Sequence, residues 1–370
     1  MSGDGPDVAA FSDTYLPTVN GVSYTVQAWR DRWTARGNRM AVVYPDADRT
    51  PDADEHPVWS LPLPFYEGFR LALPRVPDAV GDSDLVHAHT PFSLGLAGYR
   101  LARRRDLPLV ASYHTPTAEY ADYVAVGDRS AGLLRRASER WERWFYDRAD
   151  VAVVPSDATR DHLRDAVGVS TPVEVVPNGV DVERFAPADP TDFLERHGLA
   201  DAGPLVGYTG RHGYEKRLED LVGAAAGLDA TLVFGGDGPA RADLEDEAAA
   251  AGVDARFLGF LDRDDLPAFY SALDVFAFPS PVETQGLVAL EANACGTPVV
   301  GADSGALATT VDDGETGYNF ETGDVGDFRD ALERALANEA TLSENCLARR
   351  ESLSVERAVD RLTDVYAGVG

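Results

Sequence analysis

The chain has 370 residues, of which 44% are hydrophobic and 26% are charged. This length suggests two domains, and the composition excludes a globally disordered protein. No apolar run approaches the ~18–20 residues that a membrane-spanning helix needs, and the polar start of the chain predicts no signal peptide. The two cysteines, Cys295 and Cys346, imply no disulfide framework, so we expect a cytoplasmic protein.

The charge balance is strongly acidic, with 62 acidic residues, 33 basic residues and a net charge of −29. A surface of this sign repels phosphodiester backbones, so nucleic-acid binding is not expected. Such acidity is typical of proteins from halophilic microbes, where high salt screens the repulsion. The chain has one lysine, Lys216, and 32 arginines, a bias that GC-rich coding also favours. The position of the single lysine therefore indicates a specific requirement.

Short apolar runs alternate with amphipathic stretches along the chain, beginning with Asp7–Phe11 and the helical pattern Val22–Arg36. The other main expected strands are Met40–Tyr44, Leu85–Ala88, Leu109–Tyr113, Val151–Val154, Val173–Val176, Pro204–Tyr208, Thr231–Phe234, Ala255–Leu258, Val275–Phe278 and Pro298–Ala302. The alternation predicts an α/β protein with two doubly wound, Rossmann-like halves that face each other across a ligand cleft.

A turn-rich stretch, Pro177–Asp181, marks the predicted join between these halves. We expect an N-terminal domain over residues 1–180 and a C-terminal domain over residues 181–350. A final helix within residues 351–370 would pack on either half, including back on the N-terminal domain. The acidic stretch Pro45–Pro57 is predicted to be a mobile loop, and we assign it no function.

Three features of the N-terminal half suggest contacts with a ligand. The Asn20-Gly21 turn follows the first strand, where it either brings backbone close to a phosphate or simply begins a helix. His114 follows a strand and is placed either to hydrogen-bond a substrate hydroxyl or to serve as a structural histidine. His87 and His89 share a strand face by period two, but no third ligand stands nearby, so we expect no metal site.

The stretch Leu133–Asp150 is aromatic and locally basic within an acidic protein. Its aromatic and basic residues at helical spacing are Trp141, Trp144, Phe145, Arg136, Arg140 and Arg143. One interpretation is a domain helix whose aromatic side chains fill the core. The other is a membrane-surface helix, over residues 133–150, that brings the protein peripherally to the inner face of a membrane and to a lipid acceptor.

Two basic residues, Arg211 and Lys216, follow a strand of the C-terminal half and so lie at the carboxyl edge of its sheet. An arginine can clamp a phosphate through two hydrogen bonds, and a lysine supplies a compact charge. The alternative is an ordinary basic surface turn, against which the scarcity of lysine argues. The glycine-rich stretch Gly235–Pro239 also follows a strand, where it either lines a nucleotide site or forms a tight turn.

The stretch Phe278–Gly301 combines a strand end, a loop with Glu283 and Gly286, and a helix over about Leu287–Cys295. Gly286 lets backbone N–H groups approach a ligand, and the N-terminus of the helix favours an anion. Glu291, about one turn into the helix, can accept hydrogen bonds from a ribose diol. The alternative is a solvated helix residue. Glu283 would then meet the group that lies beyond the phosphates.

At these residues the sequence resembles family 4 of the retaining glycosyltransferases, which have the GT-B fold. The resemblance covers nearly the whole chain and is carried by Glu283-x7-Glu291 within PSPVETQGLVALEANACGTPVV, by Arg211 and Lys216, and by PNGVD and ALDVFAFPS. Within the family, the stretches FSDTYLPTVNGVSYTV, LVHAHTPFSLGLAGYRLAR and SYHTPTAEY are similar to the branch that makes glycosyl-diacylglycerols and related mannolipids.

The resemblance implies that the C-terminal domain binds a nucleotide-sugar donor and the N-terminal domain binds the acceptor. Arg211 and Lys216 would hold the donor diphosphate, Glu291 the ribose and Glu283 the sugar. Additional contacts are implied for Gly21 and Asn20 near the diphosphate, for Gly286, Leu287 and Val288 at the donor, and for His114 near the sugar and acceptor. The resemblance also implies no cofactor, because the nucleotide sugar is a co-substrate. It implies no metal, because the basic pair and the helix dipole would stabilise the departing diphosphate instead.

Two positions depart from the family pattern. Ala308 and Thr309 stand where relatives commonly have Pro-Glu, so one donor-side contact or helix start could differ. Asn20 replaces a frequent glycine, which could tighten the loop that faces the phosphates. Neither change removes the basic pair or the two carboxylates.

The predicted reaction moves a hexose from a UDP- or GDP-linked sugar to an acceptor hydroxyl, with retention at the anomeric carbon. The acceptor would be a membrane lipid or a lipid-linked glycan, and a neutral His114 would accept a hydrogen bond from a hydroxyl. The alternatives are a nucleotide-sugar epimerase of the same architecture and a non-catalytic nucleotide-sugar-binding protein. A glycosidase fits less well, because a hydrolase with two carboxylates has no use for the basic pair.

Overall fold

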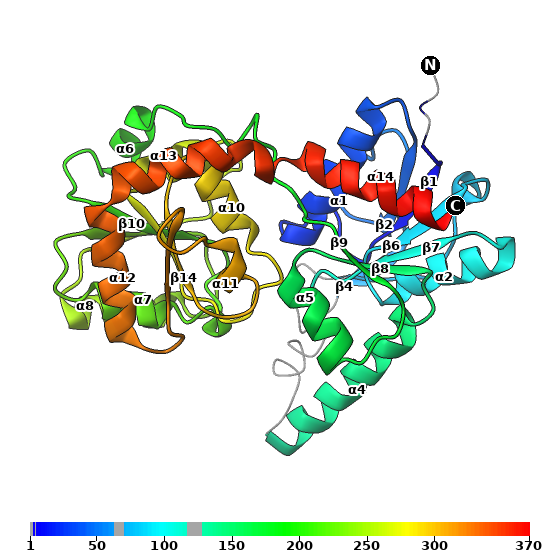
Figure 1. The fold of residues 1–370 in the computed structure, drawn as a ribbon, viewed down its shortest axis with the longest axis horizontal. Coiled ribbons are helices and arrows are strands. Elements are labelled where there is room, and N and C mark those ends of the chain that lie inside the picture. The colour runs from blue at the N-terminus through cyan, green and yellow to red at the C-terminus, as the bar shows by residue number, and fades with distance from the viewer. Residues whose placement is uncertain (1–2, 4, 63–69, 117–127) are drawn as a thin grey trace. The chain divides into compact units, whose positions relative to one another are not determined.

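The computed structural model describes residues 3, 5–62, 70–116 and 128–370. The chain forms two compact units: unit 1 is Met1–Gly179 with Val355–Gly370, and unit 2 is Val180–Ser354. Each unit contains a parallel sheet flanked by helices (Figure 1). The stretch Pro177–Asp181, where the sequence places the join, spans the boundary between the units, and the last helix belongs to unit 1.

Unit 1 is built on a seven-stranded parallel sheet in the order β3-β2-β1-β6-β7-β8-β9. Its strands are β1 (Val8–Phe11), β2 (Met40–Pro45), β3 (Glu55–Val58), β6 (Leu85–Ala88), β7 (Leu109–Ser112), β8 (Val151–Val154) and β9 (Val173–Val175). Its α-helices are α1 (Gly21–Ala35), α2 (Ser93–Arg105), α4 (Asp128–Tyr146), α5 (Asp157–Asp161) and α14 (Val355–Val369). A separate antiparallel pair is formed by β4 (Ser60–Pro62) and β5 (Arg70–Ala72).

The strands of this sheet read as unbroken apolar runs because helices cover both faces. Along β1, Val8 and Ala10 join a core cluster that includes Trp29 of α1 and residues of α14. Ala9 and Phe11 point the other way and join a second cluster with residues of α2. Alternate side chains therefore pack into two different cores. A strand with one face in solvent would have polar residues at every second position, and this strand has none.

The start of α14 is held tightly in unit 1, and α14 lies beside α1 (Figure 1). The Trp29 indole N–H donates a hydrogen bond of 2.8 Å to the carbonyl of Asn178. Gly179 has a φ of +78°, and a Cβ added there would lie 2.5 Å from the Cα of Val355. The glycine in the PNGVD turn is thus needed where the chain passes the beginning of α14.

Unit 2 has a six-stranded parallel sheet in the order β12-β11-β10-β13-β14-β15. Its strands are β10 (Leu205–Thr209), β11 (Thr231–Gly235), β12 (Ala255–Gly259), β13 (Val275–Phe278), β14 (Val299–Ala302) and β15 (Gly317–Phe320). Its α-helices are α6 (Thr191–His197), α7 (Leu218–Ala225), α8 (Arg241–Ala251), α9 (Leu266–Ala272), α10 (Leu287–Ala294), α11 (Leu307–Thr310), α12 (Val325–Ala337) and α13 (Glu339–Arg349). One continuous core cluster fills this unit.

The prediction that Pro45–Pro57 is a mobile loop was wrong at its end. β3 begins at Glu55 and pairs with β2 at the edge of the sheet. The Glu55 side chain is only 1% exposed; it forms an ion pair with Arg49 and accepts a hydrogen bond of 3.1 Å from Tyr15. A four-residue edge strand that contains Pro57 leaves little signal, because an edge tolerates proline and polar residues.

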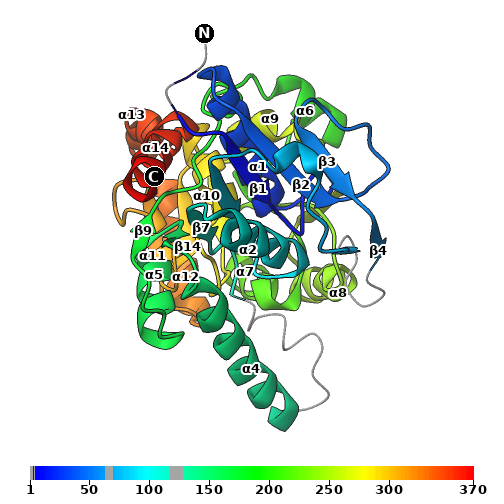
Figure 2. The same cartoon turned by 90° about the vertical axis from the view of Figure 1, so that its right-hand side faces the viewer.

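Helix α4 extends away from the sheet of unit 1 (Figure 2). Its aromatic side chains are divided between two environments, because Phe145 is buried whereas Trp144 is 37% exposed. Trp141 is half-buried, and its indole N–H donates to the carbonyl of Pro91 over 2.9 Å. The core interpretation therefore holds for one end of the helix only. Among the described residues, no helix combines the length and the apolar composition needed to cross a bilayer.

Candidate functional site

The loops after β10 and β13 are neighbours in unit 2, because these strands lie side by side where the strand order reverses. Ligands of open parallel sheets bind at such a switch point, outside the carboxyl ends of the strands. The loop after β10 carries Arg211 and Lys216, and the loop after β13 carries Glu283. Residues 67 positions apart in the chain therefore come together here.

The contact that joins these loops is an ion pair between Lys216 and Glu283. The Lys216 ammonium donates to Glu283 Oε1 over 2.6 Å, and the two side chains are 20% and 16% exposed. Burial alone would lower the pKa of Lys216, but the adjacent Glu283 carboxylate raises it above its ordinary value. The only lysine of the chain is thus a fixed positive charge that does not point into bulk solvent.

Arg211 lies on the same loop and is more open, with 41% of its side chain exposed. Its guanidinium forms an ion pair with Glu215. Tyr208, at the end of β10, donates a hydrogen bond of 3.3 Å to the Arg211 carbonyl. Gly210 passes so closely over this ring that a Cβ would lie 2.9 Å from the tyrosine oxygen. The buried tyrosine therefore supports the backbone that presents Arg211.

The glycine-rich turn after β11 packs directly against the same loop. A Cβ on Gly236 would lie 2.0 Å from the Gly210 carbonyl oxygen, and one on Gly238 would lie 2.5 Å from the His212 carbonyl oxygen. The His212 N–H also donates to the Asp237 carbonyl over 2.8 Å. These glycines form a tight turn in which the backbones of the two loops touch. This close packing by itself explains why glycine stands at these positions.

Helix α10 begins directly after Gly286, which has a φ of +76°. A Cβ at this position would lie 2.9 Å from Leu307 Cδ2, so both the conformation and the space favour glycine. Leu287 and Val288, the first helical residues, are partly buried. The helix α11 still forms from Leu307 despite the departure at Ala308 and Thr309, and the Ala306 N–H donates to the Glu283 carbonyl over 3.1 Å.

Glu291 is not a solvated helix residue, since only 7% of it is exposed. Tyr270 donates a hydrogen bond of 2.9 Å to its Oε2, and the Arg263 guanidinium lies 3.8 Å from its Oε1. Burial raises the pKa of Glu291 to about 7, although Arg263 and Tyr270 oppose the rise. The carboxylate therefore lies in a dry, polar setting suited to hydroxyl donors.

In unit 1, Asn20 caps α1, which begins at Gly21. The Asn20 side chain accepts a hydrogen bond of 2.8 Å from the Ser23 N–H, and it donates one of 2.8 Å to the Thr14 hydroxyl. The helix-entry interpretation of this turn is therefore confirmed. Gly21 is exposed at the first position of the helix, and its contact with a phosphate stays a prediction.

Three buried histidines lie together at the ends of β6 and β7. His87 contacts the Tyr366 hydroxyl through Nδ1 (2.7 Å) and the Ser112 hydroxyl through Nε2 (2.8 Å), so it is a satisfied structural histidine. Its ring stacks on that of His89, with 4.0 Å between centroids. His89 Nδ1 in turn lies 3.1 Å from His114 Nε2. Burial lowers the pKa of His114 to about 4, so this side chain is neutral at pH 7.

Sequence reasoning did not identify Tyr208, Tyr270 or Arg263 as supporting residues, and it considered His89 only as a possible metal ligand. Tyr270, Arg263 and His89 are each more than 20 positions from the group that they contact, so no local spacing signals these contacts. Tyr208 is three positions from Arg211 but lies in an apolar strand, where it reads as a core residue. Within the described part of the chain, no cluster of three or more His, Cys, Asp or Glu side chains is arranged to hold a metal ion.

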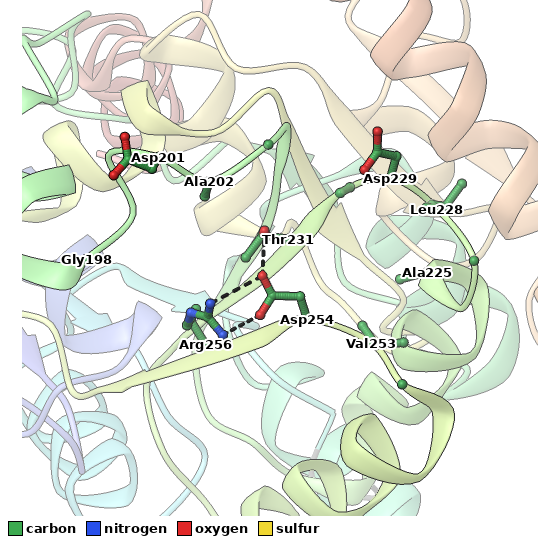
Figure 3. A pocket seen from close by; sticks show the side chains of 14 residues that line it. Gly198, Asp201, Ala202, Ala225, Leu228, Asp229, Thr231, Val253, Asp254 and Arg256 are labelled. Carbon is green, nitrogen blue, oxygen red and sulfur yellow. Dashed lines mark hydrogen bonds and ion pairs between the residues drawn. The ribbon is translucent and has the colours of Figure 1, made fainter.

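A hollow of about 640 Å³ lies near the amino ends of β11 and β12, the strand ends opposite to those that carry the candidate site (Figure 3). Its polar side chains contact one another: Asp254 accepts a hydrogen bond of 3.0 Å from Thr231 and forms an ion pair with Arg256. It contains none of the predicted site residues. Because ligands of parallel sheets bind at the carboxyl ends, we assign this hollow no role.

Comparison with known proteins identifies the family. The model for Glycosyltransferase Family 4 matches residues 19–184, and the model for Glycosyl transferases group 1 matches residues 190–351. A GDP-mannose-dependent alpha-mannosyltransferase of Mycolicibacterium smegmatis is 33% identical over 344 residues, which span 90% of this chain and 88% of that protein. The chain belongs to glycosyltransferase family 4. It is a retaining hexosyltransferase, which favours the predicted transferase over an epimerase or a non-catalytic binding protein.

Two further proteins are similar to this family 4 glycosyltransferase. The Alpha-monoglucosyldiacylglycerol synthase of Streptococcus pneumoniae is 28% identical over 97% of this chain and 85% of that protein. The crystal structure of Anabaena Alr3699/HepE in complex with UDP-glucose matches with a TM-score of 0.79 and 20% identity, covering 98% of this chain and 100% of that one. This likeness, together with the two parallel α/β sheets, confirms the predicted GT-B fold.

Proposed function

We propose that this glycosyltransferase moves a hexose from a nucleotide diphosphate sugar to an acceptor hydroxyl, with retention at the anomeric carbon. The observation that carries the proposal is the ion pair between Lys216 and Glu283, beside Arg211, at the switch point of unit 2. A diphosphate has the charge and size to engage both cations. Similar proteins support a nucleotide-sugar donor, because one relative is a GDP-mannose-dependent mannosyltransferase and one structural neighbour was solved in complex with UDP-glucose.

The donor diphosphate would replace carboxylates as the partner of the two cations. Lys216 is balanced by Glu283, and Arg211 by Glu215. When the diphosphate takes over these cations, the Glu283 carboxylate becomes able to accept hydrogen bonds from hydroxyls of the donor sugar. As the glycosidic bond breaks, negative charge grows on the diphosphate, and charges already in place stabilise it without further reorganisation.

The rest of the donor would be held by α10 and the residues around it. The buried Glu291 would accept hydrogen bonds from the ribose diol, and the backbone of Gly286, Leu287 and Val288 would face the diphosphate and sugar. Gly21 would approach the diphosphate, and His114 would act near the sugar and the acceptor. No residue needs to form a covalent intermediate, because in retention of this type the acceptor attacks on the face that the diphosphate leaves.

We assign the acceptor to a membrane lipid or a lipid-linked glycan, with the protein at the inner face of a membrane. The support comes from the relative named an alpha-monoglucosyldiacylglycerol synthase and from the arginines of α4. Arg136 and Arg140 are exposed on this helix, and Arg143 is 59% exposed. Exposed Leu134 and Trp144 accompany them, a combination that suits a lipid interface.

The test is the variant Lys216→Ala, assayed for sugar transfer from GDP-mannose and from UDP-glucose to a membrane lipid extract in high salt. Removing a charge that contacts the leaving group should lower kcat/KM by about 10²–10³-fold. The matched control is Arg217→Ala, because Arg217 is the next residue but forms its ion pair with Asp220 over 2.7 Å. Turnover of the Lys216 variant close to that of the Arg217 variant, with both folded, would contradict the proposal.

A further inference from the structure

His89 is the buried side chain that contacts His114 in unit 1. His89 Nδ1 and His114 Nε2 are 3.1 Å apart, and the two rings are nearly parallel, with 14° between their planes. His89 is 1% exposed and His114 is 9% exposed. Burial lowers the pKa of both imidazoles, so both are neutral at physiological pH.

A hydrogen bond between two neutral imidazoles contains one proton, and only two arrangements supply it. In the first, His89 Nδ1–H donates to His114 Nε2, and the proton of His114 lies on its Nδ1. In the second, His114 Nε2–H donates to His89 Nδ1, and the proton of His89 lies on its Nε2. The two arrangements therefore differ in the tautomer of both rings.

The surroundings of His89 Nε2 separate these arrangements. This atom is buried and has no hydrogen-bond partner among the residues that the structure describes. The second arrangement would leave an N–H donor there without an acceptor, whereas the first leaves only a lone pair. Orphaned buried N–H groups are rarer in folded proteins than acceptors that lack a partner, and an unmade donor bond loses its full desolvation free energy. The first arrangement is favoured.

We propose that His89 is a positioning residue, which donates from Nδ1 and thereby holds His114 in the tautomer with its proton on Nδ1. This inference rests on the proposed role of His114 near the donor sugar and acceptor. Any group that His114 meets through Nδ1 then receives a hydrogen bond. A substrate oxygen that meets His114 at Nδ1 would therefore accept a hydrogen bond, whereas the sequence predicts that His114 accepts one from a hydroxyl.

His87 provides an internal comparison within the same stack. Both of its nitrogens contact hydroxyl groups, those of Tyr366 and Ser112. A hydroxyl can donate or accept, so these partners leave the tautomer of His87 open. The constraint on His114 therefore comes from its contact with another imidazole and from the dry surroundings of that imidazole.

The direct experiment is ¹⁵N NMR of the full chain labelled at histidine, with the His114 signals assigned by comparison with His114→Gln. We expect Nδ1 of His114 to be protonated and Nε2 to be unprotonated at neutral pH. A protonated Nε2 would overturn the inference. The control is His87→Gln, which changes the stacked neighbour but not the bond to His114, and should leave the His114 tautomer unchanged.

Two variants of His89 then connect the tautomer to the reaction. His89→Asn keeps an N–H donor near the position of Nδ1, whereas His89→Leu removes it. We expect the Leu variant to lose the Nδ1–H preference of His114 and to lower kcat about tenfold, corresponding to one hydrogen bond in the transition state. The Asn variant should retain both properties to within about threefold. The inference would also be overturned if His89→Asn and His89→Leu both fold, both keep the wild-type tautomer of His114 and lose activity equally.

The outcomes separate this inference from the proposed function. If His114 has the Nδ1–H tautomer but His114→Gln transfers sugar normally, the catalytic role of His114 fails and the positioning by His89 stands. If His114→Gln is inactive but Nε2 carries the proton in the wild-type protein, the role stands and the positioning fails.

Discussion

Glu291 shows how strongly one residue depends on its surroundings. As a helix residue next to open solvent it would ionise near the ordinary value of 4.5, but burial raises its pKa to about 7. Tyr270 and Arg263 satisfy the carboxylate without restoring the hydration that it loses. The group is therefore half-protonated near neutral pH, and any hydroxyl donors that bind it will favour its ionised form.

The raised pKa of Glu291 predicts a defined dependence of stability on pH. Because the folded state binds the proton more tightly, the contribution is complete below about pH 4.5 and is lost as pH rises through about 7. We expect the free energy of unfolding of the wild-type protein, relative to Glu291→Gln, to fall by about 3 kcal/mol across this window. Chemical denaturation at several pH values measures it.

The control for this prediction is Glu339→Gln. Burial also raises the pKa of Glu339, but this residue is the first of α13 and has no contact with Glu291. A pH dependence of stability that survives in the Glu291 variant but disappears in the Glu339 variant would show that Glu291 is not its source.

At the scale of elements, α4 combines two roles that its sequence could not separate. Phe145 and Tyr146 anchor one end in the core, and the Tyr146 hydroxyl donates to the Ser112 carbonyl over 3.0 Å. The other end extends away from the sheet with exposed arginines (Figure 2). A firmly anchored helix with a basic, partly apolar free end is suited to contact a lipid surface.

We predict that the double variant Arg136→Gln, Arg140→Gln binds less to vesicles that contain anionic lipid. Each arginine near such a surface contributes about 1 kcal/mol, so the partition coefficient should fall roughly thirtyfold. Cosedimentation with vesicles measures it. The control, Arg103→Gln with Arg104→Gln, removes the same charge from the exposed end of α2. Equal losses in both double variants would mean that only net charge matters and that α4 is not the contact.

At the scale of the whole molecule, the main electrostatic feature is the net charge of −29. Many acidic side chains are paired locally, as in the ion pairs of Arg196 with Asp265 and Arg241 with Glu245. There are nevertheless 62 acidic side chains for 33 basic ones, so one-to-one pairing leaves an excess of 29 acidic side chains. The folded chain therefore carries self-repulsion that the surrounding ions must screen.

This repulsion predicts that salt stabilises the protein. Raising KCl from about 0.1 M to about 1 M shortens the Debye length from ~10 Å to ~3 Å and should raise Tm by about 5–10 °C. Thermal unfolding followed by circular dichroism measures the change. At about pH 5, where part of the carboxylates are protonated, the same salt step should have a smaller effect. A Tm that is flat or falls with salt at pH 7 would contradict this account.

The sequence by itself determined the class of fold and most strand positions, because parallel strands covered on both faces must be apolar throughout. Leu85–Ala88, Val151–Val154 and Val275–Phe278 were predicted with the bounds that the structure shows. The weak edge strands β3 and β15 were missed, since a strand with one partner and an open side tolerates polar residues and proline.

The candidate site was also predictable from the sequence only in part. Sequence alone identified Lys216, Glu283 and Glu291, because scarce lysine and motif spacing are local signals. Only the tertiary structure decided that Lys216 contacts Glu283, that Tyr270 donates a hydrogen bond to the buried Glu291, and that His114 lies within hydrogen-bond distance of His89. These contacts join residues that are 21 to 67 positions apart. They depend on which strands are neighbours in each sheet, and no short stretch of sequence encodes that order.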